Sequence, residues 1–156
     1  MSTQAQRIEV TLETVLDSVD LAEDIALRVA GEAGFDDEDC HKIGMSVREA
    51  VINAYSYGNR KERARKICLT LELDERKLVV HVLDEGKNFR LADVPDPLAE
   101  ENLLRTSGRG IFLMRAFMDE FDIQSGPNGG TELVMSKKFP SAAGGNGAAG
   151  KLPESR

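Results

Sequence analysis

Polar side chains recur at four-residue spacing in the stretch EAVINAYSYGN, which runs from Glu49 to Asn59. Residues i and i+4 of a helix lie about 40° apart around its axis, so Glu49, Asn53 and Tyr57 would form one row. An amide oxygen suits Mg²⁺, which completes its coordination with phosphate oxygens and water. A carboxylate one turn away can accept the proton of an attacking hydroxyl. Such a pair is most often found on an ordinary helix surface, so both interpretations stay open.

A second group of candidate residues lies where predicted strands begin or end. Asp84 ends an apolar strand in VLDEGKNF, and its carboxylate can accept a hydrogen bond from the amine of adenine. Gly86 would let the backbone approach a flat base closely. Thr131, in GGTEL, could place a hydroxyl beside the same edge of the base. Each also fits an ordinary alternative, a turn for the first two and a β-branched strand residue for Thr131.

Two glycines bracket Arg109 in TSGRGIFLMRAFMDEF, where a loop is predicted to enter a helix. Free amides at a helix N-terminus bind phosphate, and Gly108 and Gly110 would let the loop wrap around it. The stretch is not a Rossmann fingerprint, because Leu113 replaces the third glycine. The sequence also lacks a Gly-Lys-Ser/Thr phosphate loop and the His-Arg-Asp and Asp-Phe-Gly motifs of protein kinases.

Length, charge and cysteine content narrow the class of protein. The chain has 156 residues, which fits one domain with one core. Its net charge of −7 argues against direct nucleic-acid binding through phosphate contacts, although an acidic protein can dock on a basic protein partner. Cys40 and Cys68 match no metal-binding spacing and are expected to be reduced thiols in a cytoplasmic protein. We find no signal peptide and no apolar run that could span a membrane.

Periodicity predicts the elements that would position the candidate residues. Alternating apolar residues predict strands at 7–13, 67–73, 78–82, 121–125 and 131–139. A first helix is predicted at 19–33, with Asp17 or Ser18 as its cap and Leu21, Ile25, Ala26 and Val29 as its apolar stripe. A second helix is expected to begin at Asp36 and Asp37 and to end at Gly58 and Asn59, and a third to span 111–120.

Two stretches show no periodicity. Residues 86–108 contain Pro95, Pro97 and many acids, and they are too long for an ordinary connection, so we predict a lid. Residues 140–156 are small, polar and rich in glycine, which predicts a disordered tail. The folded domain is therefore expected to cover residues 1–139.

Taken together, the order and spacing of these motifs resemble the GHKL ATPase superfamily, which contains histidine-kinase ATP domains, gyrase and a class of chaperones. The closer resemblance is to the anti-sigma-factor serine kinases, the RsbW-like family of bacteria. It rests on SVREAVINAYSYGN, GRGIFLMRAFMDEF and GTELVMSKKF, and it covers roughly residues 7–139.

The resemblance implies an α/β sandwich of the histidine-kinase-like ATPase (Bergerat) type. A mixed, mostly antiparallel sheet would be covered on one face by the helices around Ile25, Val51 and Leu113. ATP and Mg²⁺ are the implied cofactors, with Asn53 as the Mg²⁺ ligand and Glu49 as the general base. The other residues implied to bind the nucleotide are Asp84, Gly86 and Thr131 at the adenine and Gly108, Arg109 and Gly110 at the phosphates.

The implied function is that of a serine/threonine-protein kinase and anti-sigma factor that phosphorylates an anti-anti-sigma (STAS-like) protein. Its implied partners are that protein and a sigma factor, and a homodimer is allowed. Two positions depart from the family pattern: Tyr57 stands where a histidine is common, and Asn88 replaces a glycine. Asn88 favours an alternative, a nucleotide-binding partner-switch module with little or no phosphotransfer, whereas Glu49 favours the kinase. An adaptor domain that binds no nucleotide is a third alternative.

Overall fold

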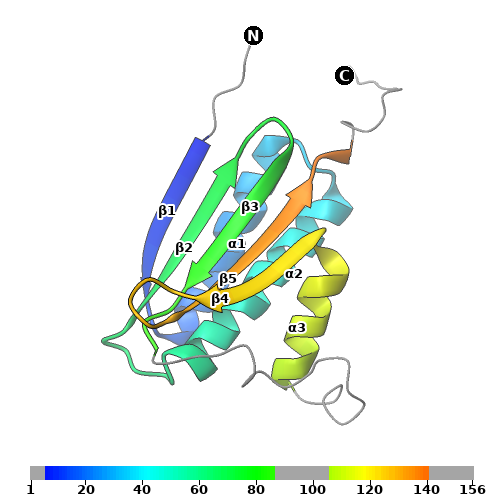
Figure 1. The fold of residues 1–156 in the computed structure, drawn as a ribbon. Coiled ribbons are helices and arrows are strands. Elements are labelled where there is room, and N and C mark those ends of the chain that lie inside the picture. Colours follow the sequence, from blue (N-terminus) through cyan, green and yellow to red (C-terminus); the bar gives the residue numbers. More distant parts are fainter. Residues whose placement is uncertain (1–5, 87–105, 141–156) are drawn as a thin grey trace.

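A five-stranded sheet forms one layer of the molecule, and the helices cover one of its faces (Figure 1). The structure, a computed structural model, describes residues 6–86 and 106–140. The strands are β1 (Gln6–Glu13), β2 (Lys66–Leu73), β3 (Lys77–Leu83), β4 (Glu120–Ser125) and β5 (Thr131–Lys138), in the spatial order β1-β2-β3-β5-β4. The helices are α1 (Leu16–Ala33), α2 (Asp37–Asn53) and α3 (Thr106–Phe117), and a π-helical turn, η1 (Ala54–Gly58), follows α2.

The predicted fold class is confirmed, since this is an α+β architecture with helices on one side of the sheet. Each of the four strand pairings in the described residues is antiparallel. The antiparallel order brings the end of β3 beside the start of β5, because Leu83 pairs with Glu132. Candidate residues that are far apart in the sequence, Asp84 and Thr131, therefore become neighbours.

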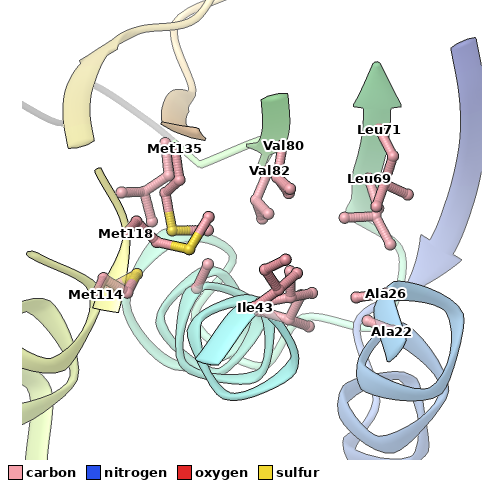
Figure 2. Close-up of a cluster of buried hydrophobic side chains, with 14 of the residues drawn as sticks. Ala22, Ala26, Ile43, Leu69, Leu71, Val80, Val82, Met114, Met118 and Met135 are labelled. Atoms are coloured by element: carbon pink, nitrogen blue, oxygen red, sulfur yellow. The ribbon is translucent and has the colours of Figure 1, made fainter. Parts of the chain in front are cut away.

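The core lies between the sheet and the helices (Figure 2). Alternate residues of β2 and β3, including Leu69, Leu71 and Val80, point toward the helices and are fully buried. Burial of a side chain of this size contributes about 1.5–3 kcal/mol. Next to β5 and α3 the core consists largely of methionine side chains, among them Met114 and Met135. The alternating pattern in the sequence thus identified the inward face of these central strands correctly.

The start of α1 differs from the prediction. The helix begins at Leu16, and its N-cap is Val15, whose side chain makes no capping hydrogen bond. Ser18, expected as a cap, instead donates its hydroxyl to the carbonyl oxygen of Glu13 at 2.7 Å. That bond ties the first turn of α1 to the last residue of β1, so a contact with the preceding strand replaces the local cap.

The predicted apolar stripe of α1 is only partly correct. Ala22, Ala26 and Ala30 are fully buried, whereas Leu21 is 49% exposed. The small residue where α1 packs closely against α2 is Gly44, on which a β-carbon would lie 2.8 Å from the Leu27 side chain. The alanines of α1 belong to the buried core, and Leu21 lies outside it.

The second helix ends in a way that the sequence did not predict. After Asn53 it widens into η1, in which the Asn59 amide donates to the Ala54 carbonyl oxygen, five residues back, at 2.7 Å. A π turn takes more residues than an α turn, so the four-residue row formed by Glu49 and Asn53 is not simply continued. Tyr57, the expected third member of that row, is 53% exposed.

The third helix begins earlier and ends earlier than predicted. It starts at Thr106 rather than Ile111, and it ends at Phe117 because Glu120 already begins β4. Gly108 and Gly110 therefore lie within the first turns of α3 and not in a loop before it. Their low helix propensity suggested a loop, but packing of α3 against α2 overrides that weak preference.

Two predictions fall on residues that the structure does not describe. The proposed lid, apart from Gly86 and the start of α3, lies outside the described residues, and so does Asn88. The tail predicted at 140–156 lies outside them as well, except for Pro140.

Two glycines of α1 give a matched pair of substitutions. Gly34 caps the helix with φ 106°, whereas Gly31 is helical, and a β-carbon on either would meet nothing within 4 Å. We expect Gly34→Ala to lower the free energy of unfolding by about 1–2 kcal/mol, the cost of a left-handed alanine. Gly31→Ala should raise it by about 0.5–1 kcal/mol, the gain in helix propensity. Urea denaturation of both variants measures the difference, and shifts of the same sign would contradict it.

Candidate functional site

Asp84 lies just beyond the end of β3 and is held by the backbone around it. Its Oδ1 accepts hydrogen bonds from the Gly86 amide at 2.9 Å and the Thr131 amide at 3.1 Å. Its own amide donates to the Thr131 carbonyl oxygen at 3.0 Å. The residue is only 6% exposed. These bonds fix the carboxylate in one orientation and leave Oδ2 as the acceptor that they do not use.

Three glycines from separate segments surround this carboxylate. A β-carbon on Gly58 would lie 2.0 Å from Asp84 Oδ2, and one on Gly130 would lie 2.0 Å from the Asp84 carbonyl oxygen. A β-carbon on Gly86 would lie 2.1 Å from the Gly58 carbonyl oxygen. Since contacts this short involve backbone or a fixed carboxylate, no side chain fits at these positions without displacing Asp84 or Gly58. We call Gly58, Gly86 and Gly130 the glycine cradle.

The environment of Asp84 opposes its ionisation. Burial raises the pKa of this carboxyl group, and it outweighs the hydrogen bonds from Gly86 and Thr131 and the positive charge of Arg65, which lower the pKa. A buried carboxylate with a raised pKa is a poor contributor to stability but a strong acceptor for a ligand that brings a donor.

Thr131 adds a polar group that the protein leaves unused. Its Oγ1 is buried and has no hydrogen-bond partner within the described residues. Leaving a buried hydroxyl unpaired costs about 1–3 kcal/mol, and Thr131 also donates its amide to Asp84, so the two residues adjoin. A planar base with an amine donor and ring nitrogens fits a carboxylate acceptor, a hydroxyl and a surface of glycines. The structure brings Asp84, Gly86 and Thr131 together, and their binding of adenine stays a prediction.

A second group of candidate residues meets where α2 contacts α3. A β-carbon on Gly110 would lie 2.6 Å from Glu49 Oε1, so the early part of α3 lies directly against this carboxylate. Asn53 is the last residue of α2, and its side chain is half-buried. Gly108 and Arg109 lie in the first turn of α3, where the structure describes the backbone alone. The segment from Glu49 to Gly58 thus connects this group to the glycine cradle.

The described residues contain no group of three or more His, Cys, Asp or Glu side chains that could hold a metal ion. A Mg²⁺ ion at Asn53 would therefore depend mainly on phosphate oxygens and water, which is its usual coordination beside a nucleotide. The amide of Asn53 is a suitable neutral ligand for that purpose.

The sequence did not identify two members of the cradle as site residues. Gly58 was placed at the end of a helix, and Gly130 fell between two predicted strands. The repeated glycine in GPNGG is a signal for Gly130, because a turn needs only one residue with a positive φ, and Gly129 has it, at 92°. No local signal exists for Gly58, whose role depends on its contact with Asp84.

Comparison with known proteins identifies the class to which this fold and site belong. Residues 12–137 match the histidine kinase-like ATPase domain, and the chain belongs to that family. No helix in the part of the chain that the structure describes is long and apolar enough to cross a membrane.

Relatives of this chain are named anti-sigma F factor and serine-protein kinase RsbW. It is 36% identical over 106 residues to an anti-sigma F factor of Clostridium acetobutylicum, covering 65% of this chain and 72% of the relative. It is 27% identical over 143 residues to the serine-protein kinase RsbW of Listeria innocua, covering 88% of this chain and 90% of the relative. The predicted resemblance to RsbW-like anti-sigma kinases is confirmed.

A solved structure shows the same fold. The crystal structure of the RsbU and RsbW domains of a Mycobacterium tuberculosis protein matches with a TM-score of 0.61 at 18% identity. The match covers 85% of this chain and 32% of that longer one. At this identity the likeness concerns the fold alone.

The raised pKa of Asp84 predicts how its substitution changes stability with pH. The folded state holds the proton of this carboxyl more tightly than the unfolded state, so wild-type stability falls as pH rises from the ordinary value of 3.8 through the raised pKa. Asparagine carries no charge at any pH. Asp84→Asn should therefore gain stability relative to wild type as pH rises from about 3 to about 7.

Asp74 provides a control of opposite sign. The amides of Arg76 and Lys77 lower its pKa, so its carboxylate contributes stability above the ordinary pKa that is lost in acid. Asp74→Asn should lose stability relative to wild type over the same rise in pH. Urea denaturation at several pH values measures both, and parallel trends in the two variants would contradict the assignment.

Proposed function

We propose that this chain is an ATP-dependent serine/threonine-protein kinase and anti-sigma factor in a partner-switching system. Its substrate would be a small anti-anti-sigma protein of the STAS type. The observation that carries the proposal is the buried Asp84 carboxylate in its glycine cradle, beside a Thr131 hydroxyl that has no hydrogen-bond partner among the described residues. Relatives named anti-sigma F factor and serine-protein kinase RsbW support it.

Adenine would be recognised at the end of β3. Asp84 Oδ2 would accept the exocyclic amine, and the Thr131 hydroxyl would bond to the same edge of the base. The cradle glycines would let the base lie against the backbone. Guanine places a carbonyl oxygen where adenine has its amine, so it would oppose the carboxylate and be rejected.

The phosphates would lie between α2 and α3. Amides in the first turn of α3, around Gly108 and Gly110, would face phosphate oxygens, with Arg109 adding positive charge. Asn53 would hold Mg²⁺, which neutralises charge on the phosphoryl oxygens when bound. Glu49 would accept the proton of the substrate hydroxyl during in-line attack on the γ-phosphate. Because Gly110 lies against Glu49, α3 would also help to position the Glu49 carboxylate as the general base.

The partners in this proposal are proteins. They are the anti-anti-sigma substrate and a sigma factor, in the cytoplasm, without direct contact to nucleic acid or a membrane. A net charge of −7 favours docking on basic protein surfaces. A homodimer is compatible with the sheet, because β1 is an edge strand that pairs only with β2 in the described residues. We assign this function to an ATP-binding domain covering residues 1–139.

One alternative has a specific observation in its favour. Tyr57, at a position where relatives of this type often carry a histidine, is 53% exposed and lies on the π turn between Asn53 and the cradle. A domain altered here, and at Asn88, could hold nucleotide and sequester a partner with little or no phosphotransfer.

Nucleotide recognition can be tested at Asp84. Asp84→Asn replaces an acceptor by a donor opposite the adenine amine. One charge-assisted hydrogen bond is worth about 1.5–3 kcal/mol, so ATP affinity should fall about tenfold or more. Calorimetry with ATP and Mg²⁺ measures the change, and Asp74→Asn, far along the sheet, is the control that should bind normally. Unchanged affinity in Asp84→Asn would remove adenine recognition from the proposal.

Catalysis can be separated from binding at Glu49. Glu49→Gln keeps the shape of the side chain but cannot accept the proton, so phosphotransfer should fall by roughly 10²–10⁴ with little change in ATP affinity. Asn53→Ala should lose both Mg²⁺-dependent ATP binding and transfer. The measurement is a single-turnover assay on the cognate STAS-like protein, read by intact mass.

The outcomes distinguish the two candidate functions. Transfer at the wild-type rate by Glu49→Gln would reject Glu49 as the base. Wild-type protein that binds ATP but leaves the substrate unmodified would favour the partner-switch module over the kinase.

A further inference from the structure

Asn59 is a buried polar residue that was predicted only to end a helix and that the proposed chemistry does not use. It directly follows Gly58 of the glycine cradle and is completely buried. Its Nδ2 donates to Thr14 Oγ1 at 2.7 Å and to the Lys66 carbonyl oxygen at 3.0 Å. Its Oδ1 accepts from the Glu85 amide at 2.8 Å. One side chain therefore joins the segment after β1, the start of β2 and the segment after β3.

The chemistry of the partners fixes the amide orientation and excludes close substitutes. The Lys66 carbonyl oxygen can only accept, and the Glu85 amide can only donate, so a flipped amide would oppose both. The Thr14 hydroxyl gives its own proton to the Arg65 carbonyl oxygen at 2.6 Å, so it too needs a donor from Asn59. An aspartate would set a buried negative charge against the Lys66 carbonyl oxygen.

The hydrogen bond from the Glu85 amide to Asn59 lies next to the carboxylate of Asp84 in the sequence. Glu85 is held a second time, because its Oε1 accepts the Lys66 amide at 2.7 Å. On the other side of Asn59, Gly58 lies against Asp84 Oδ2. The dipeptide Gly58–Asn59 thus contacts the dipeptide Asp84–Glu85 at both residues. Displacing it would move Asp84 relative to Thr131.

Backbone strain beside Asn59 indicates that its position is held against a cost. Arg60 and Lys61, the next two residues, have φ values of 52° and 61°, in the left-handed region that side chains with a β-carbon disfavour. Such a conformation is strained and persists only where surrounding contacts impose it. The chain leaves η1 through these residues and reaches β2 at Lys66, whose carbonyl oxygen Asn59 binds.

We propose that Asn59 is a positioning residue for the nucleotide site: its bond to the Glu85 amide holds Asp84 where the carboxylate can meet adenine. The proposal rests on the proposed ATP binding. Asn59 itself touches no nucleotide and acts through the backbone at Glu85. Its two other bonds anchor it to β1 and β2, so the site is set by the ends of three strands and not by the loop alone.

Thr14 offers the matched control. Thr14→Val removes the hydroxyl that Asn59 binds but leaves the bond between Asn59 Oδ1 and the Glu85 amide, and Thr14→Ser keeps the hydroxyl. Asn59→Ala removes all three bonds. If Asn59→Ala does not fold, Asn59→Ser is used in its place, because the serine side chain is too short to reach the Glu85 amide.

The first measurement is ATP·Mg²⁺ affinity by calorimetry, well below the melting temperature of each full-length variant. Asn59→Ala should lose about tenfold or more in affinity, the factor expected when one buried hydrogen bond is removed. The Thr14→Val variant should be less stable than wild type, yet its ATP affinity should stay within about threefold of the wild-type value. Thr14→Ser should resemble wild type in both properties. Affinity that falls in proportion to lost stability in all variants would overturn the proposal.

The second measurement is amide hydrogen exchange without nucleotide, which does not depend on the proposed function. The peptide containing Glu85 and Gly86 should exchange faster in Asn59→Ala than in wild type and should be unchanged in Thr14→Val. Wild type that fails to bind ATP would reject the proposed function, while faster exchange in Asn59→Ala would still support positioning of Asp84. Unchanged exchange there would overturn the inference whatever the binding result.

Discussion

Burial of the Asp84 carboxylate is the constraint that determines the structure at the end of the sheet where the candidate site lies. A carboxylate that is 6% exposed must receive hydrogen bonds from fixed donors, and the amides of Gly86 and Thr131 supply them. The antiparallel pairing of β3 with β5 brings those donors together. The surrounding backbone then comes so close that Gly58 and Gly130 leave no space for a β-carbon. The raised pKa shows that the donors only partly offset the cost of burial.

At the opposite end of the sheet, side-chain contacts hold α2 and α3 in place. Lys137 is 8% exposed, and its Nζ donates to the Phe117 carbonyl oxygen at 2.7 Å, where the C-terminus of α3 favours a positive charge. The same Nζ lies 3.8 Å from Asp39 near the start of α2. The rings of Phe35 and Phe139 stack there with centroids 4.4 Å apart. Both helices that carry candidate residues are therefore anchored at the end far from Asp84.

The sequence predicted what depends on periodicity and local chemistry. Alternation of Ile67, Leu69 and Leu71 identified the inward face of β2, and Asp36 does cap α2 by accepting the Asp39 amide at 2.8 Å. The order of motifs also led to the correct family. These features repeat along the chain, so neighbouring residues carry enough information to specify them.

Features that depend on contacts between distant segments were missed. The stripe of α1 was misplaced at Leu21, because the face that packs into the core contains Ala22, Ala26 and Ala30 instead. The start of α3 was placed after its glycines because their contact with α2 cannot be read locally. The helical segment does end at Gly58 and Asn59 as predicted, but the π turn and the contact of Asn59 with Thr14, 45 positions away, were not predicted. Each of these errors concerns tertiary contacts that override a local preference.

Several structural costs in the described residues lie at one end of the sheet, whereas another, the buried Ser46 hydroxyl without a hydrogen-bond partner there, lies within α2. Asp84 is buried with a raised pKa, the Thr131 hydroxyl is buried and unpaired, and Arg60 and Lys61 adopt left-handed conformations. Selection for stability alone would favour substitutions that remove these costs, for example asparagine at position 84 or glycine at position 61. A ligand that brings an amine to Asp84 and a ring nitrogen to Thr131 would relieve the first two directly. The contacts of Asn59 hold the left-handed turn at Arg60 and Lys61, so under the proposed function the strain and the buried carboxylate would belong to one site, and ligand binding would offset part of their cost.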